Sequence, residues 1–156
     1  MSFEKVKAWF DTIGMGARVK HFEASSATVE LAAQAVGTAP AQIAKTLSFL
    51  VDEQPILIVA AGDAKIDNKK YKALFHKKAR MIPPEAVEEI IGHAPGGVCP
   101  FLTKEGVVSY LDESLKRFDV VYPAAGDAHS AVELSPEEFG RLLPEAAWID
   151  VCKLPE

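Results

Sequence analysis

The sequence predicts a single α+β domain built around a mixed β-sheet. Its 156 residues fit one domain with a stable core, and no repeat, low-complexity tract or linker divides the chain. Hydrophobic residues make up 49% and charged residues 25%, which is typical of a globular protein. Helical and extended patterns follow one another without the regular βαβ order of a parallel doubly wound sheet. We therefore expect residues 1–156 to form one domain.

The N-terminal part of the chain predicts two helices separated by a short strand. Apolar residues recur at helical spacing in both expected helices. The expected elements are, in order, a helix over residues 2–14, a strand over 18–23 and a helix over 28–37. Their expected caps are Ser2, Gly14 and Thr28.

The middle of the chain predicts a β-hairpin followed by two helices. Two β-branched, apolar runs, residues 45–52 and 55–62, flank a polar turn and predict the strands of the hairpin. Because both runs are almost continuously hydrophobic, we expect strands that are buried on both faces. Asp67 is a suitable N-cap for a helix over residues 68–75, and the helix expected over 84–92 begins with proline and ends with glycine.

The C-terminal part predicts four short strands and one helix. The strands are expected over residues 107–112, 119–123, 131–135 and 148–152. Between the last two, Ser135, Pro136 and Glu138 form a capping box with proline in the first turn, which predicts a helix over 135–143.

Composition excludes several classes of partner. The net charge of −5 argues against a protein that coats DNA or other nucleic acid non-specifically. No apolar run approaches the roughly 20 residues of a membrane helix, and the N-terminal segment has no hydrophobic signal core, so no membrane partner is expected. With only Cys99 and Cys152, we expect free thiols and a reducing cytoplasm rather than a disulfide.

Neither a metal nor a cofactor is expected from the motifs. The four histidines are scattered, and neither cysteine belongs to a CxxC or similar metal-binding pair. The chain has no P-loop and no GxSxG elbow, and GGVCPF does not match GxGxxG.

A basic stretch, residues 69–80, interrupts the otherwise acidic composition. It reads KKYKALFHKKAR and holds six cations and no acid, namely Lys69, Lys70, Lys72, Lys77, Lys78 and Arg80. One interpretation is a solvated helix face. The other is a docking patch for phosphate groups.

The segment GHAPGGVCPF, residues 92–101, contains a candidate nucleophile. Cys99 could serve this role if His93 or His129 acted as its base. However, its apolar neighbours favour a protonated thiol, and free cysteine usually packs as a small hydrophobe.

The backbone of the same segment offers a second kind of chemistry. Gly96 and Gly97 allow the chain to approach a ligand closely, so the amides of residues 97–99 could stabilise an anion or a polarised carbonyl. Pro100 would stiffen the exit of this loop. A tight turn between a helix and a strand would explain the same glycines.

Four stretches occur in an order and spacing that indicate a family. They are AQIAKTLSFL, GDAKIDNKKYK, GGVCPF and AAGDAHSAVELSPEEF. Together they resemble the YbaK-like family of aminoacyl-tRNA deacylases, which is related to the editing domain of bacterial prolyl-tRNA synthetases. The resemblance covers residues 21–151 and implies a mixed, mostly antiparallel, barrel-like sheet surrounded by helices.

The resemblance also implies roles for individual residues. Lys45 matches the essential lysine of the family, and His129 lies where related synthetase domains often carry a histidine near the aminoacyl pocket. The catalytic GxxxP loop corresponds to Gly96, Gly97, Val98, Cys99 and Pro100. Two positions differ from the family pattern: the loop continues as Pro-Phe-Leu rather than PxG, and Thr46 replaces the asparagine common in alanine-editing members.

The implied activity is hydrolysis, in trans, of the ester that joins a wrong amino acid to tRNA, with Ala-tRNA(Pro) or Cys-tRNA(Pro) as the expected substrate. Lys45 would bind the terminal phosphate or ribose, the loop amides would stabilise the oxyanion, and a vicinal tRNA hydroxyl would help to activate water. Thr46, His129 and Cys99 would line the amino-acid pocket, and the basic stretch would hold the acceptor stem. A prolyl-tRNA synthetase would be a further partner. The alternative is a non-catalytic aminoacyl-tRNA- or nucleotide-binding module of the same fold.

Overall fold

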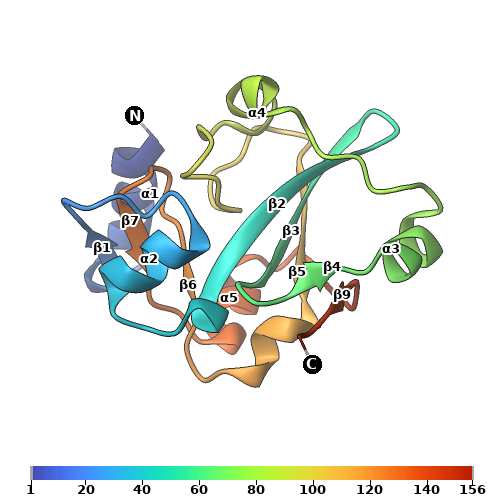
Figure 1. Ribbon diagram of the computed structural model, residues 1–156. Coiled ribbons are helices and arrows are strands. Elements are labelled where there is room, and N and C mark those ends of the chain that lie inside the picture. The colour runs from blue at the N-terminus through green and yellow to red at the C-terminus, as the bar shows by residue number, and fades with distance from the viewer. Residues whose placement is uncertain (1, 156) are drawn as a thin grey trace.

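The computed structural model describes residues 2–155 and is organised around a five-stranded sheet (Figure 1). Its strands are β2 (Ile43–Val51), β3 (Gln54–Ala61), β5 (Val108–Asp112), β6 (Tyr122–Pro123) and β8 (Ala147–Ile149). The hydrogen-bonded order is β6-β2-β3-β5-β8. The sheet is mixed, curled and open, so it forms a half-barrel, which agrees with the mixed, barrel-like sheet that the resemblance implied, although most of its strand pairs are parallel rather than antiparallel.

Antiparallel and parallel pairs both occur in the structure. The longest pairing is the antiparallel β2–β3 hairpin, in which Lys45 lies opposite Ala60. The other three pairs of the five-stranded sheet, β2–β6, β3–β5 and β5–β8, are parallel. Two small antiparallel sheets complete the structure: β1 (Val19–His21) pairs with β7 (Ser130–Val132), and β4 (Lys65–Ile66) pairs with β9 (Cys152–Lys153).

Within residues 2–155, five α-helices surround these sheets (Figure 1). They are α1 (Ser2–Thr12), α2 (Val29–Val36), α3 (Asn68–Phe75), α4 (Pro84–Ile91) and α5 (Pro136–Leu142). Three short 3₁₀ helices lie in the connections, namely η1 (Gly16–Arg18), η2 (Pro40–Gln42) and η3 (Glu113–Arg117).

The local signals predicted most helix ends correctly, but the expected N-cap Ser2 lies within α1, and its hydroxyl donates to the carbonyl of Gly92. The hydroxyl of Thr28 accepts a hydrogen bond from the amide of Leu31, and Asp67 accepts bonds from two amides of the first turn of α3. The capping box between Ser135 and Glu138 is present with both of its hydrogen bonds. The first helix ends two residues earlier than predicted, and Gly14 takes the left-handed conformation just after it.

The C-terminal strands are shorter than the sequence indicated. The run 148–152 divides into two strands of different sheets, β8 and β9, because the amide of Val151 donates to the Asp112 carboxylate instead of to a strand. Of the run 119–123, only Tyr122 and Pro123 form a strand, while Val121 makes an isolated bridge with Leu134.

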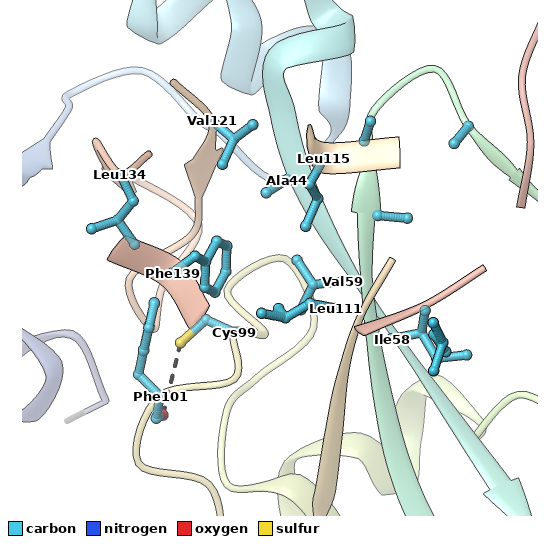
Figure 2. Close-up of a cluster of buried hydrophobic side chains, with 14 of the residues drawn as sticks. Ala44, Ile58, Val59, Cys99, Phe101, Leu111, Leu115, Val121, Leu134 and Phe139 are labelled. Carbon is cyan, nitrogen blue, oxygen red and sulfur yellow. Dashed lines mark hydrogen bonds between the residues drawn. The ribbon is translucent and has the colours of Figure 1, made fainter. Parts of the chain in front are cut away.

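The main core lies between the five-stranded sheet and the segments that cover it. Residues 56–61 of β3 are all buried, which confirms the prediction that this strand is buried on both faces. Figure 2 shows part of this core, in which side chains of the sheet meet Leu134, Phe139 and Phe101 from the C-terminal half and the glycine-rich loop. The cavity described next lies where one end of β2 meets α2, β6 and β7.

Candidate functional site

A cavity of about 170 Å³ lies at the start of β2. Its lining comes from five segments: residues 26–29 with Ala32 of α2, residues 43–46 of β2, Tyr122 and Ala124, Ser130 and Ala131, and the glycine-rich loop through Gly96 and Val98. The lining holds one ionisable amine, that of Lys45, together with Tyr122, and no carboxylate or imidazole. Chemistry in this cavity therefore depends on a lysine, hydroxyl groups and backbone dipoles.

Lys45 is the only cation among the described residues of the cavity lining. Its ammonium group donates to the backbone carbonyls of Gly62, at 3.4 Å, and of Ala64. No carboxylate lies within ion-pair distance of it among the described residues. Partial burial lowers the pKa of Lys45, while the field of Asp63 opposes this shift. The result is a half-buried cation that neutral carbonyls hold, which leaves its charge available to an anionic ligand.

The glycine-rich loop begins with a β-turn over residues 94–97. The amide of Gly97 donates to the carbonyl of Ala94 at 3.0 Å, Pro95 occupies the second position, and Gly96 has a φ of +90° in the third. Proline followed by a positive-φ glycine is the pattern of a type II turn. The tight turn that the sequence suggested is therefore present.

This turn changes the expected set of amide donors. Gly97 cannot serve as a free donor in this conformation, because its N–H group is used within the turn. The amides of Val98 and Cys99 have no hydrogen-bond acceptor among the described residues. Of these two residues, only Val98 contributes to the cavity lining, so the structure favours its amide over that of Gly97.

Close packing fixes the position of this loop. A Cβ atom on Gly97 would lie 2.4 Å from the Cα atom of Asp127, so only glycine fits against this backbone. A Cβ atom on Gly96 would lie 3.2 Å from that of Ala27 and 3.4 Å from that of Ala128. The loop is thus held between the segment that precedes α2 and the segment that precedes β7.

Cys99 lies in the hydrophobic core and not in the cavity wall, which corrects our expectation (Figure 2). It is fully buried, and desolvation raises the pKa of its thiol to about 12. The Nε2 atom of His93 lies 3.5 Å from the Cys99 sulfur but only 2.7 Å from the carbonyl of Phe101. Since a carbonyl only accepts, Nε2 carries the ring proton and cannot act as a base toward the thiol. The arrangement does not support a cysteine nucleophile.

Thr46 is the unpaired hydroxyl of the cavity wall. Its Oγ1 atom is buried and has no hydrogen-bond partner among the described residues. The other hydroxyls of the lining are paired: Ser26 and Ser130 bond to each other's backbone or to neighbouring backbone groups, and Thr28 caps α2. Because its Oγ1 atom has almost no exposed surface, a bound molecule reaches this hydroxyl only if the wall around it moves. Sequence reasoning did not identify Ser26, Tyr122 or Ser130, although Ser130 directly follows His129 in one of the four stretches that indicated the family.

Residues 23–142 match the family model of the aminoacyl-tRNA editing domain. The chain belongs to the aminoacyl-tRNA editing domain family. It is 51% identical over 154 residues to YwhH of Bacillus subtilis, and the alignment covers 98% of both proteins. It is 23% identical over 126 residues to the proline–tRNA ligase of Lactiplantibacillus plantarum, covering 80% of this chain but only 22% of the ligase.

Solved structures agree with this membership in an editing family. One, provisionally described as a trans-editing enzyme for prolyl-tRNA synthetase, superposes with a TM-score of 0.86 at 32% identity over 97% of both chains. The structure of the protein APE2540 superposes with a TM-score of 0.84 at 27% identity, over 96% of this chain and 99% of that one. These matches confirm the family and the fold that the four sequence stretches indicated.

His129 lies beside the editing-domain cavity rather than in its lining, which differs from our expectation. Its Nδ1 atom lies 3.1 Å from the carbonyl of Ala24, and its amide donates to the carboxylate of Asp127. That carboxylate also lies 3.2 Å from the Nε2 atom of His21. His129 thus joins the segment before α2 to the segment before β7, next to the glycine-rich loop.

The basic stretch is exposed but lies away from the cavity of the editing domain. All six of its cations are exposed, and none of them lines the cavity. Lys70 pairs with Asp150 and Lys77 pairs with Asp52, while the other four have no carboxylate within ion-pair distance among the described residues. Figure 1 shows α3 on the opposite side of the β2–β3 hairpin from α2. The stretch could therefore contact only a ligand that extends well beyond the cavity.

Two negative observations complete the description of residues 2–155. No cluster of three or more His, Cys, Asp or Glu side chains in this part of the chain could hold a metal ion. Within the same range, every helix is too short or too polar to cross a membrane.

Proposed function

We propose that this protein hydrolyses, in trans, the ester bond of mischarged tRNA, with Ala-tRNA(Pro) or Cys-tRNA(Pro) as the substrate. The observation that carries this proposal is the composition of the cavity: its described lining holds one half-buried lysine and Val98, whose amide is unpaired, and no carboxylate or imidazole. Such a site suits a substrate that is already activated, as an aminoacyl ester is. It needs no side-chain nucleophile, only positioning and stabilisation of charge.

Lys45 binds the terminal phosphate or ribose of the tRNA in this mechanism. Its ammonium group interacts with carbonyl oxygens rather than a carboxylate, so an incoming phosphate does not have to displace a paired acid. A charged hydrogen bond in this half-buried position is stronger than one in water. The lysine thereby fixes the ester relative to the glycine-rich loop.

The Val98 amide stabilises the oxyanion that forms when water attacks the ester carbonyl. Val98 is a residue of the cavity wall, its amide is unpaired among the described residues, and its loop is held by close packing. Loss of one such donor typically lowers the rate by about 10²–10³. Because no residue of the lining is an ordinary general base, a vicinal hydroxyl of the terminal ribose helps to activate the water.

The small cavity is compatible with small amino acids as targets. A volume of about 170 Å³ accommodates an alanyl or cysteinyl group together with the attacking water. A synthetase pocket distinguishes one methylene by only about 1–3 kcal/mol, so smaller amino acids escape selection there. A second, smaller pocket removes them, and in this protein Thr46 and Ser130 contribute to it.

The tRNA is the macromolecular partner in this proposal. Its acceptor end enters the cavity, and its stem reaches the exposed cations of the basic stretch through backbone phosphates. The activity belongs in the cytoplasm beside prolyl-tRNA synthetase, whose products it corrects. No cofactor takes part.

The deciding experiment is a deacylation panel with Ala-, Cys-, Ser-, Thr- and Pro-tRNA(Pro), comparing wild type with Lys45→Ala. We expect turnover of alanyl or cysteinyl substrate, no turnover of the prolyl substrate, and near-complete loss in the variant. If the wild type binds mischarged tRNA but leaves the ester intact under multiple-turnover conditions, the protein is a non-catalytic binding module. Full activity of Lys45→Ala would contradict the mechanism.

A further inference from the structure

We propose that the ion pair between Arg117 and Asp63 is a positioning device for Lys45, and that it sets both the location and the charge of the lysine. Only the expected effect on deacylation rests on the proposed function. The contacts of Lys45, Asp63 and Arg117 with the turn over residues 62–64 can be tested without tRNA.

The turn over residues 62–64 holds the ammonium group of Lys45. The two carbonyls that accept from it belong to Gly62 and Ala64, the residues on either side of Asp63. The carboxylate of Asp63 accepts from both terminal nitrogens of Arg117, at 2.5 and 3.2 Å. Arg117 thus binds the central residue of the turn, Asp63, and Lys45 contacts the residues on either side of Asp63.

The 3₁₀ helix η3 anchors the arginine and the end of β3 together. The Nε atom of Arg117 donates to the carbonyl of Ser114 at 3.0 Å, and the hydroxyl of Ser114 accepts from the amide of Ala61 at 3.1 Å. The carboxylate of Asp112 in turn accepts from the amide of Ser114. The hydrogen bond to Ser114 therefore orients the guanidinium toward Asp63, and a bidentate ion pair requires such an orientation.

A second contact restricts the turn. A Cβ atom on Gly62 would lie 2.0 Å from the carbonyl oxygen of Pro40, so η2 packs directly against the turn. The turn is therefore fixed by Pro40 at Gly62 and by Arg117 at Asp63. Removing the arginine takes away one of these two contacts, so the carbonyls and the ammonium group that they hold become less precisely placed.

The carboxylate of the pair also contributes to the electrostatic field at Lys45. The charged or titratable groups that act on its pKa are Cys152, Asp63, Lys65 and Glu30, and its burial lowers the pKa. Asp63 raises it, and Arg117 compensates part of the charge of Asp63. Replacing Arg117 by methionine leaves the carboxylate uncompensated and should raise the pKa of Lys45. Replacing Asp63 by asparagine leaves the guanidinium uncompensated and should lower it.

The test compares Arg117→Met and Asp63→Asn with a matched control, Arg18→Met. Arg18 makes a similar bidentate pair, with both nitrogens 2.9 Å from the Glu138 carboxylate, and its exposure resembles that of Arg117. The pair lies outside the cavity lining and is absent from the groups that act on Lys45. Circular dichroism and thermal melting would establish that all three variants are folded.

Titration of Lys45 is the direct readout. The Nζ resonance of Lys45, assigned by comparison with Lys45→Arg, is followed against pH by NMR in the free protein. We expect the midpoint to move up in Arg117→Met, down in Asp63→Asn, and not at all in Arg18→Met. A purely structural role would not move the two variants in opposite directions. Unchanged midpoints in both variants would overturn the proposal.

Deacylation supplies the second readout. In Arg117→Met we expect kcat/KM to fall by about tenfold to a hundredfold, the loss that follows from displacing a positioned group. Arg117→Lys should recover only part of it, since an ammonium cannot form the bidentate pair. If the midpoints shift as expected but the wild type has no deacylase activity, the positioning device stands and the proposed function fails. Wild-type activity that Arg117→Met fully retains would overturn the kinetic part of the proposal.

Discussion

Replacing Gly97 by alanine tests how strongly the glycine-rich loop depends on its packing. The added Cβ atom would lie 2.4 Å from the Cα atom of Asp127, whereas ordinary contact begins at 3.4 Å, so the backbones must separate by about 1 Å. The φ of Gly97 is not in the left-handed region, so the effect is steric. Overpacking of this kind costs about 1–3 kcal/mol of unfolding free energy.

The same displacement should lower activity more than stability alone would. Gly97 lies between Gly96 and Val98, which both line the cavity, so a shift of about 1 Å moves the Val98 amide. Misplacement of a catalytic group by about 1 Å can cost about 10²-fold in rate. We therefore expect kcat for the best substrate of the deacylation panel to fall by that factor at a temperature where the variant remains folded.

The assay pairs urea unfolding with multiple-turnover deacylation. Gly14→Ala is the control, because Gly14 also has a positive φ of +77° but a Cβ atom there would meet nothing within 4 Å. It should lose about 1 kcal/mol of stability through backbone strain and keep its activity. Wild-type kcat in Gly97→Ala, despite a measured loss of stability, would refute the role given to this loop.

Three further predictions follow from individual side chains. Cys99→Ala should retain kcat within about twofold. Iodoacetamide should modify native Cys99 very slowly, because a pKa of about 12 leaves on the order of 10⁻⁵ of the thiol ionised at pH 7. Rapid alkylation with loss of activity would instead support a cysteine nucleophile. Thr46→Val should raise the unfolding free energy by about 1 kcal/mol, since it removes a buried unpaired hydroxyl. The same variant should reduce hydrolysis of Ser- and Cys-tRNA(Pro) relative to Ala-tRNA(Pro). Unchanged substrate ratios would place this hydroxyl outside the amino-acid subsite. Replacing Lys69, Lys72 and Lys78 together by alanine should weaken tRNA binding and lessen its salt dependence. Alanine at the exposed Lys116 of η3 should change neither the affinity for tRNA nor its salt dependence. Equal effects of the triple variant and the Lys116 variant would argue for non-specific attraction.

Local rules explain why most of the fold could be predicted from the sequence. The ends of α3 match the prediction at both residues, because Asp67 caps it and the hydrogen bonds of such a cap involve only adjacent amides. The hairpin was equally clear, since the turn between its strands brings them together over a short loop. The mixed sheet and the family were also predicted correctly.

Long-range contacts explain what the sequence could not specify. The parallel pairing of β3 with β5 joins segments about 50 residues apart, and no local pattern determines which strands become neighbours. The division of 148–152 into two strands depends on the side chain of Asp112, which is distant in sequence. The burial of Cys99 likewise depends on its contacts with His93 and Phe101, so its reactivity could be judged only in the folded protein.

Most contacts of the candidate site also could not be predicted from the sequence. Lys45 was identified through the family resemblance, because an isolated strand lysine carries no signal of its own. The turn that holds its ammonium group belongs to the stretch GDAKIDNKKYK, but its contact with Lys45 was not predicted, and Arg117 lies outside all four stretches. The unpaired hydroxyl of Thr46 is evident only when the partners of its neighbours are known.

The lack of reactive side chains in the cavity follows from the nature of the proposed substrate. An aminoacyl ester would hydrolyse slowly without any enzyme, so a strong nucleophile or base in the wall would not be needed, and it would also attack correctly charged tRNA. A wall of small residues, one held cation and one fixed amide can instead act only on an ester that fits between them. Selectivity and rate then depend on the same distances. For this reason the packing of Gly97 on Asp127 and the ion pair of Arg117 with Asp63 are as important for the proposed hydrolysis as Lys45 itself.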